Sequence, residues 1–126
     1  MINLYLDDTR KCPENFILAK TFEEAIFILE NYKVNILSLD HDLGLDKNGN
    51  LRKTGYDLVK YICENNILVN EIYLHTANPV GRENMYHTLL SAQRRGFINK
   101  SIKIYPYPYI RWQSKEFTKE GLIIKL

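Results

Sequence analysis

The chain has 126 residues, a length that fits one domain with a real core and is too short for two. Apolar residues make up 45% of the sequence and charged residues 25%, values that exclude disordered and collagen-like classes. The net charge of +2 is spread over interspersed acidic and basic residues, so we expect no generic nucleic-acid coating, while a small anionic ligand stays open.

Apolar patterning in the first third of the chain predicts strands that alternate with one helix. The predicted elements are strands over 2–6 and 16–20, a helix over 22–32 and a strand over 34–39. Thr21 and Glu24 stand at capping-box spacing at the start of that helix. The connection between the first two strands is too short for a full crossover helix, so we expect the first helix to be missing or vestigial.

The rest of the chain continues the alternation after a polar loop of about a dozen residues, a length typical of lids and binding loops. Thr54 is a predicted cap for the next helix, Asn78 caps the last helix, and Gly96 stops it. The predicted elements are a loop over 44–55, a helix to about 65, a strand over 71–75, a helix over 79–95 and a fifth strand within 101–107.

Strands alternating with helices predict an α/β fold with a doubly wound, mostly parallel five-stranded sheet. We expect one domain over 1–105 and a C-terminal extension over 106–126 that packs on the same domain as an edge hairpin or a cover over the sheet. The aromatic stretch "YPYPYIRW" in that extension suits stacking on a base, although most of the tyrosines are expected to be core or surface aromatics.

No stretch of about 18 apolar residues occurs, and the N-terminus lacks a basic region followed by a long apolar run. Cys12 and Cys63 are the only cysteines, and their spacing supports neither a disulfide framework nor a zinc site. We therefore expect a soluble, cytoplasmic protein without a membrane segment; a homodimer stays open.

Polar side chains follow three of the predicted strands at the point where each strand ends. In parallel α/β sheets, ligands bind at the carboxyl ends of the strands. We therefore expect one site at this edge, built from Asp7, Asp8, Asp40, His41, Asp42, His75 and Thr76.

Clustered carboxylates repel one another unless a cation neutralises them, although a single acidic residue after a strand is more often a cap or turn former. The predicted cofactor is a divalent metal, Mg²⁺ or Mn²⁺ first, with Ca²⁺ as a further hard cation and a softer transition metal if His41 or His75 is a ligand. The candidate carboxylate ligands are Asp7, Asp8, Asp40 and Asp42.

The histidines have different expected roles. His75 is either a general acid or base, which its ordinary pKa suits, or a core histidine bonded to a carbonyl. His41 lies between two carboxylates, which favour its protonated form and suit it to stabilise a phosphoryl oxyanion. His87 sits in mid-helix and is expected to be structural or exposed.

The predicted helix N-terminus after Asn78 is a second candidate region, because free backbone N–H groups and the positive end of the helix dipole attract phosphate. Thr76, Asn78 and Arg82 are candidate phosphate donors, and simple capping by Asn78 is the alternative. Arg10 is either a further anion ligand or a solvated loop charge.

The acidic pair after the first strand, Asp40 after the third and Thr76 after the fourth resemble a receiver domain of the response-regulator type. In ordinary receivers the acidic pair helps to hold Mg²⁺ and the aspartate after the third strand accepts a phosphoryl group. The resemblance implies these roles for Asp7, Asp8 and Asp40. The lysine expected after the fifth strand has no clear counterpart, because Lys103 is poorly placed, while His41, Asp42 and His75 are additional.

These additions resemble the cyclic-phosphate processing receiver domain family through four motifs in the right order over residues 2 to about 95. The motifs stand here as "LYLDDTR", "LSLDHDLG", "TGYDLVKYI" and "HTANPVGRENM". The resemblance implies a receiver-like, flavodoxin-like fold, a role on cyclic phosphates or related nucleotides, and an association with RNA repair and defence.

The leading interpretation is a metal-dependent phosphoesterase that opens a cyclic phosphate on a nucleotide or ribose derivative, with Asp40, His41 and His75 as catalytic residues. A covalent aspartyl-phosphate at Asp40 is a variant of this scheme. The alternatives are a non-catalytic sensor or sponge for a nucleotide-like ligand, a signalling receiver phosphorylated on Asp40, which the missing lysine disfavours, and a structural domain with an inherited acidic pocket.

Overall fold

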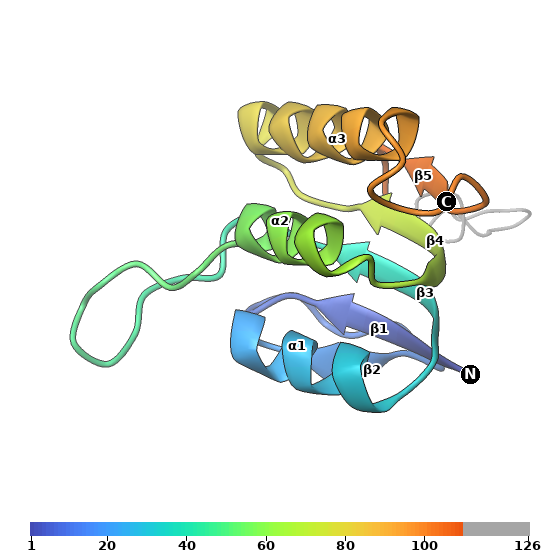
Figure 1. Ribbon diagram of the computed structural model, residues 1–126. Helices are drawn as coiled ribbons and strands as arrows, with labels where there is room; N and C mark the ends of the chain where they lie inside the picture. The colour runs from blue at the N-terminus through green and yellow to red at the C-terminus, as the bar shows by residue number, and fades with distance from the viewer. Residues whose placement is uncertain (110–126) are drawn as a thin grey trace, which may run out of the picture.

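The computed structural model describes residues 1–109, which form a five-stranded parallel sheet and three helices (Figure 1). The strand order is β2-β1-β3-β4-β5. The elements are β1 (Ile2–Leu6), β2 (Ile17–Ala19), α1 (Phe22–Asn31), β3 (Val34–Leu39), α2 (Gly55–Asn65), β4 (Val69–Leu74), α3 (Pro79–Arg94) and β5 (Lys103–Tyr105).

The receiver-like α/β class and the five strands predicted from the sequence are confirmed, and every strand pair is parallel. The predicted absence of the first helix is also confirmed, because a loop joins β1 directly to β2. The differences are at the element ends: β4 begins two residues earlier than predicted, and β2 and β5 are only three residues long.

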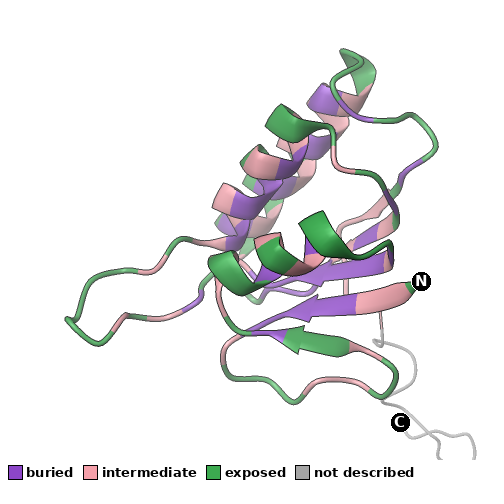
Figure 2. Cartoon of the chain, turned by 60° about the horizontal axis from the view of Figure 1, so that its bottom comes forward, coloured by how far each residue is buried: buried purple, intermediate pink, exposed green. Residues whose placement is uncertain are grey.

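All three helices lie on the same face of the sheet (Figures 1 and 2). Crossovers between parallel strands are almost always right-handed, so the direction of each step along the sheet decides the face that its helix covers. The steps from β2 to β3, β4 and β5 run in one direction and place α1, α2 and α3 together. The step from β1 to β2 runs the opposite way, as in the predicted doubly wound strand order, and the helix that would cover the other face is the missing one.

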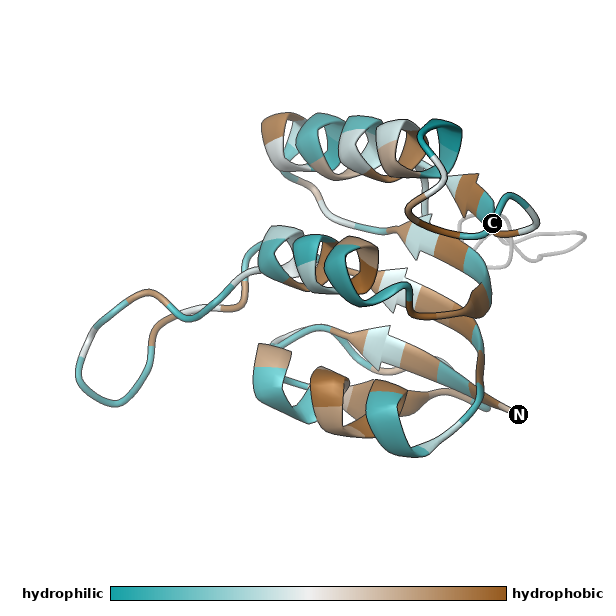
Figure 3. Ribbon diagram, viewed as in Figure 1, coloured by the Kyte–Doolittle hydropathy of each residue, from teal (hydrophilic) through white to brown (hydrophobic). Residues whose placement is uncertain are grey.

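The core lies between the helices and this face of the sheet. Alternate residues of β1, β3 and β4 point into it, and each fully buried leucine or isoleucine contributes about 1.5–3 kcal/mol. The helices meet these strands with residues such as Leu29, Ile62 and Leu89. The strand residues are Leu4, Leu6, Leu37, Leu39, Ile72 and Leu74. In Figure 3 the strands carry much of the hydrophobic colour, whereas the long loop before α2 is mostly hydrophilic.

The opposite face carries aromatic and polar side chains. Tyr5, Ser38 and Tyr73 lie side by side on it, because β1, β3 and β4 pair in that register. The rings of Tyr107 and Tyr109 lie 6.3 and 5.1 Å from the Tyr73 ring. The start of the predicted C-terminal extension therefore packs on this face, and the remainder, 110–126, lies outside the described residues.

Each predicted helix cap is present. The Thr21 hydroxyl accepts a hydrogen bond from the Glu24 backbone N–H at α1, and the side-chain Oδ1 of Asn78 accepts one from the Gly81 backbone N–H at α3. At α2, Thr54 and Asp57 form a complete capping box. A cap of this kind stabilises a helix by about 1 kcal/mol, so these residues fix where α2 and α3 begin beside the carboxyl edge of the sheet.

The loop between β3 and α2 extends away from the sheet and returns to it (Figure 1). Leu45 and Leu51 pair across it, and the Gly55 backbone donates to the His41 carbonyl oxygen at 2.8 Å, where the loop rejoins α2. The loop thus begins and ends at the edge that carries Asp40 and His41. None of the helices in residues 1–109 has the length and apolar character needed to cross a membrane.

Candidate functional site

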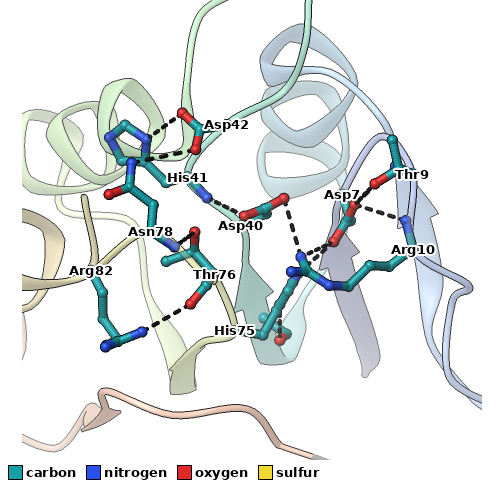
Figure 4. A network of polar contacts seen from close by, with 11 residues as sticks. Asp7, Thr9, Arg10, Asp40, His41, Asp42, His75, Thr76, Asn78 and Arg82 are labelled. Atoms are coloured by element: carbon teal, nitrogen blue, oxygen red, sulfur yellow. Dashed lines mark hydrogen bonds and ion pairs between the residues drawn. The ribbon is translucent and has the colours of Figure 1, made fainter. Parts of the chain in front are cut away.

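The ends of β1, β3 and β4 bring Asp7, Asp40 and His75 together, as the strand-end pattern predicted (Figure 4). The Asp40 backbone N–H donates to the Leu6 carbonyl oxygen, and that of His75 to the Leu39 carbonyl oxygen, so these residues continue the sheet ladder. One potential ligand atom from each of the three side chains lies within 4.8 Å of the others. All three residues are buried.

Asp7 is 0% exposed and accepts hydrogen bonds on both carboxylate oxygens. Its Oδ1 accepts from the backbone N–H groups of Thr9 and Arg10, at 2.9 and 3.0 Å. Its Oδ2 accepts from Arg10 Nη1 and His75 Nε2, both at 2.9 Å. Burial opposes ionisation, but these hydrogen bonds outweigh it and lower the pKa of Asp7 to about 2. Asp7 is therefore an anion at neutral pH.

His75 uses both ring nitrogens within the protein. Because Asp7 is ionised and carries no proton, Nε2 of His75 must be the donor, and Nδ1 then accepts from the Ser38 hydroxyl at 2.7 Å. The imidazole also stacks on the Tyr5 ring, with centroids 4.2 Å apart and planes at 4°. Burial lowers the pKa of His75 despite the neighbouring carboxylates. His75 is thus neutral and holds Asp7 in place.

The structure adds Ser38 and Tyr5 to the site, and neither was predicted. Ser38 is fully buried, and its hydroxyl sets which ring nitrogen of His75 carries the proton. A hydroxyl in the apolar strand "VNILSL" was a detectable sign that β3 needs a polar partner on one face. Tyr5 gave no such sign, because tyrosine is common in strands.

Arg10 contacts two carboxylates, an arrangement that differs from both predicted roles, the anion ligand and the solvated loop charge. Its Nη1 lies 2.9 Å from Asp7 Oδ2 and 3.3 Å from Asp40 Oδ2. The hydrogen bond to Asp7 is the main cause of a raised Arg10 pKa. Asp40 Oδ1 accepts from the His41 backbone N–H at 2.8 Å. A role for Arg10 in phosphate binding stays a prediction.

The four predicted carboxylate ligands separate into different places. Asp7 and Asp40 join His75 in the cluster of potential ligands described above, which holds two oxygen donors and one nitrogen donor. Asp8 points toward Gly44, where an added Cβ would lie 2.7 Å from its Oδ2. Asp42 pairs with His41. The donor set fits a divalent cation, on the condition that the Arg10 side chain leaves Asp7 Oδ2.

A second group of contacts links the end of β3 to the start of α3 (Figure 4). His41 Nδ1 lies 3.0 Å from Asp42 Oδ1, and Asn78 Nδ2 donates to Asp42 Oδ2 at 3.3 Å. A carboxylate partner makes Nδ1 the protonated nitrogen, so in the neutral imidazole of His41 the lone pair lies on Nε2. The His41 side chain is 18% exposed. Asn78 therefore caps α3 and also orients the acid of an Asp–His pair.

Thr76 and Arg82 brace the turn between β4 and α3. Arg82 Nη1 donates to the Thr76 carbonyl oxygen at 3.0 Å, and the Thr76 hydroxyl accepts from the Asn78 backbone at 3.1 Å. Both residues lie where phosphate binding was predicted, beside the N-terminus of α3, but their contacts here are structural. His87 is an exposed residue within α3 that pairs with Glu83, as expected for a residue outside the site.

Comparison with known proteins gives one family. The family model described as the cyclic-phosphate processing Receiver domain matches residues 2–91, more than two thirds of the chain. This match covers every predicted site residue from Asp7 to Arg82. No curated protein matches the chain significantly. The chain therefore belongs to the family of cyclic-phosphate processing receiver domains.

Proposed function

We propose that this domain is a phosphoesterase that opens a cyclic phosphate on a nucleotide or ribose derivative. The observation that carries the proposal is the junction at Asp40 and His41, where the buried Asp7–Asp40–His75 cluster meets an oriented Asp–His pair. The cluster suits a cation, the pair suits proton transfer, and both lie beside a helix N-terminus. Membership of a cyclic-phosphate processing family supports the substrate class.

His41 is the proposed proton-transfer residue. Asp42 holds its Nδ1–H, so Nε2 can accept a proton from water as the water oxygen attacks phosphorus. One ester P–O bond then breaks, and the leaving ribose oxygen takes the proton from the His41 imidazolium. The products are a phosphomonoester and a free hydroxyl. His75 takes no part in this proton transfer, because its ring nitrogens serve Asp7 and Ser38 when no cation is bound.

The proposed cofactor is a divalent cation, Mg²⁺ or Mn²⁺, held by Asp7 and Asp40 with His75 as a nitrogen donor. Such a cation polarises a phosphoryl oxygen and stabilises developing negative charge. If Nε2 of His75 coordinates the cation, the ring proton lies on Nδ1, and Nδ1–H would then donate to the Ser38 hydroxyl. Metal-binding histidines usually have a hydrogen-bond partner of this kind on the other ring nitrogen. Arg10, Thr76, Asn78 and Arg82 are the proposed phosphate-binding residues.

Turnover of a small substrate panel tests the proposal. The panel contains 2′,3′-cyclic nucleotides, a cyclic-phosphorylated ADP-ribose and cyclic di- and oligonucleotides, each with Mg²⁺, Mn²⁺ or EDTA, with products identified by mass spectrometry. We expect metal-dependent hydrolysis that falls by about 10²-fold or more in His41→Ala and in Asp40→Asn. His87→Ala removes an exposed histidine outside the site and is the matched control. Hydrolysis that survives both site substitutions would contradict the assignment.

Gly81→Ala tests the role of His41 without removing its side chain. A Cβ on Gly81 would lie 2.5 Å from Cγ and Cδ2 of His41 and 3.1 Å from Asn78 Nδ2, so the imidazole must move and the Asn78 amide must shift slightly. We expect turnover to fall by about tenfold or more, because a displacement of about 1 Å can cost this much or more, while circular dichroism and thermal unfolding change little. Val80→Ala, at an exposed position in the same turn of α3, is the control. Unchanged turnover in Gly81→Ala would show that the position of His41 does not matter.

A non-catalytic binding module is the second candidate. One observation favours it: Asp7, Asp40 and His75 all have hydrogen-bond or ion-pair partners within the protein. A sensor or sponge would bind a ligand from the panel without forming product under every metal tested, and it would tolerate loss of His41. The same panel therefore separates the two functions.

A further inference from the structure

We propose that the Arg10 guanidinium and a divalent cation are alternative occupants of one position between Asp7 and Asp40, so that cation binding requires the arginine to swing out. The inference rests on the cation site proposed above and concerns binding, not turnover. When no divalent cation is bound, the Arg10 guanidinium occupies this position and supplies the positive charge.

The hydrogen bonds on Asp7 leave one carboxylate oxygen for a cation. Its Oδ1 accepts from two backbone N–H groups of its own turn, which keep these positions as long as the turn is folded. Oδ2 is therefore the oxygen left for a cation. That same oxygen accepts from Arg10 Nη1 and from His75 Nε2, both at 2.9 Å. A shift of the His75 proton to Nδ1 frees Nε2 to become a ligand, whereas the guanidinium has no lone pair to offer and must leave. A cation and the guanidinium thus compete for one atom.

Arg10 Nη1 contacts both carboxylates of the proposed cation site. This single nitrogen also lies 3.3 Å from Asp40 Oδ2, so it bridges the two carboxylates that a cation would bridge. Figure 4 shows the guanidinium lying between these side chains. Its positive charge offsets the repulsion between two buried carboxylates. Two ionised carboxylates and one guanidinium carry a total charge of −1. With a divalent cation in place of the guanidinium, the total charge would be zero.

The Arg10 side chain is much more exposed than the two carboxylates that it contacts. The Arg10 side chain is 41% exposed, whereas the side chains of Asp7 and Asp40 are 0% and 10% exposed. The arginine can therefore turn into solvent by rotation of its side chain alone, while the carboxylates stay in place. Once released, the guanidinium is free to bind an anion at the mouth of the site, which reconciles the predicted phosphate role of Arg10 with its present contacts.

Titration with Mn²⁺ tests the exchange, with free Mn²⁺ measured by electron paramagnetic resonance at neutral pH. Arg10→Met keeps an apolar stem but removes the competing charge, and we expect it to bind Mn²⁺ about tenfold or more tightly than the wild type. Lys11→Met removes the same charge from the next, exposed position of the same loop and is the matched control. We expect its affinity to stay within about twofold of the wild type, because an exposed charge is screened.

The other possible results of the Mn²⁺ titration distinguish the exchange from the cation site itself. Addition of Asp40→Asn to Arg10→Met must abolish the gain if Mn²⁺ binds at this position; a gain that persists overturns the proposal. Equal affinity in the wild type and Arg10→Met overturns the exchange and leaves the cation site standing. Absence of Mn²⁺ binding in both overturns the exchange and the cation site together, and turnover in EDTA then decides whether the proposed hydrolysis survives.

Thermal unfolding gives a second readout that does not depend on activity. In EDTA, Arg10→Met should unfold at a lower temperature than the wild type, because two buried carboxylates have lost their counterion. Addition of Mn²⁺ should raise its unfolding temperature more than that of the wild type. If the variant does not fold in EDTA, recovery of the fold on addition of Mn²⁺ supports the exchange, and no recovery overturns it.

Discussion

Substitution of Gly55 by alanine is expected to destabilise the protein by about 3 kcal/mol or more, among the largest effects of any single methyl group in this chain. A Cβ at this position would lie 1.9 Å from the Asp40 carbonyl oxygen and 3.0 Å from the carbonyl carbon. These are backbone atoms of the strand end that forms the site, so they cannot rotate away. Gly55 therefore lets α2 begin directly against the Asp40–His41 backbone.

Urea unfolding followed by circular dichroism measures this effect. Gly49→Ala is the control, because a Cβ there meets no atom within 4 Å and the cost is the positive φ of +82° alone, about 1 kcal/mol. Failure of Gly55→Ala to fold agrees with the prediction. A loss of stability no greater than that of Gly49→Ala would show that the helix can shift to make room.

Asp7→Asn is expected to reduce the free energy of unfolding by about 3 kcal/mol. The amide NH₂ of asparagine would face Arg10 Nη1 and His75 Nε2, which are both donors, so at least one buried donor would lose its acceptor. Asp8→Asn removes the same charge one residue further on, at a half-buried position, and should cost less than about 1 kcal/mol. Similar losses in the two variants would contradict the central position given to Asp7.

The pKa values of Asp7 and His75 predict how stability depends on pH in the presence of EDTA. Asp7 has a folded-state pKa of about 2 and an ordinary value of 3.8, so its contribution is present above pH 3.8 and is lost as the pH falls toward 2. His75 has a lowered pKa, so the unfolded chain takes up its proton first and stability begins to fall below pH 6.5. Asp7→Asn should remove the component between about pH 4 and 2. A wild-type profile that is flat between pH 4 and 2 would refute the assignment.

Much of the fold followed from the sequence because it depends on local patterns. Apolar runs ending in Asp7, Asp40 and His75 predicted that these residues meet at one sheet edge, and the parallel sheet brings them together. Right-handed crossovers then decide the face that each helix covers. The missing first helix followed from the short connection between β1 and β2, and the structure confirms it.

The detailed contacts of the site did not follow, because they depend on strand register and on loop conformation. Ser38 meets His75 only because β3 and β4 pair so that both side chains share one face. Arg10 reaches Asp40 only because the turn after β1 folds back on Asp7. The separation of Asp8 from Asp7 has the same origin, since neighbouring side chains after a strand point in different directions.

The short strand β2 is a weakly held edge of the sheet next to the site. β2 has three residues, lies at the edge of the sheet and pairs only with β1, whereas β3 pairs on both sides. The amides of such a strand exchange their hydrogens for deuterium sooner than those of central strands, because opening them breaks few contacts. The loop between β1 and β2 carries Arg10, and its far end is held by β2. The Asp7 backbone N–H also donates to the Ala19 carbonyl oxygen of β2, so opening of this edge affects both Arg10 and Asp7, whereas Asp40 follows the central strand β3.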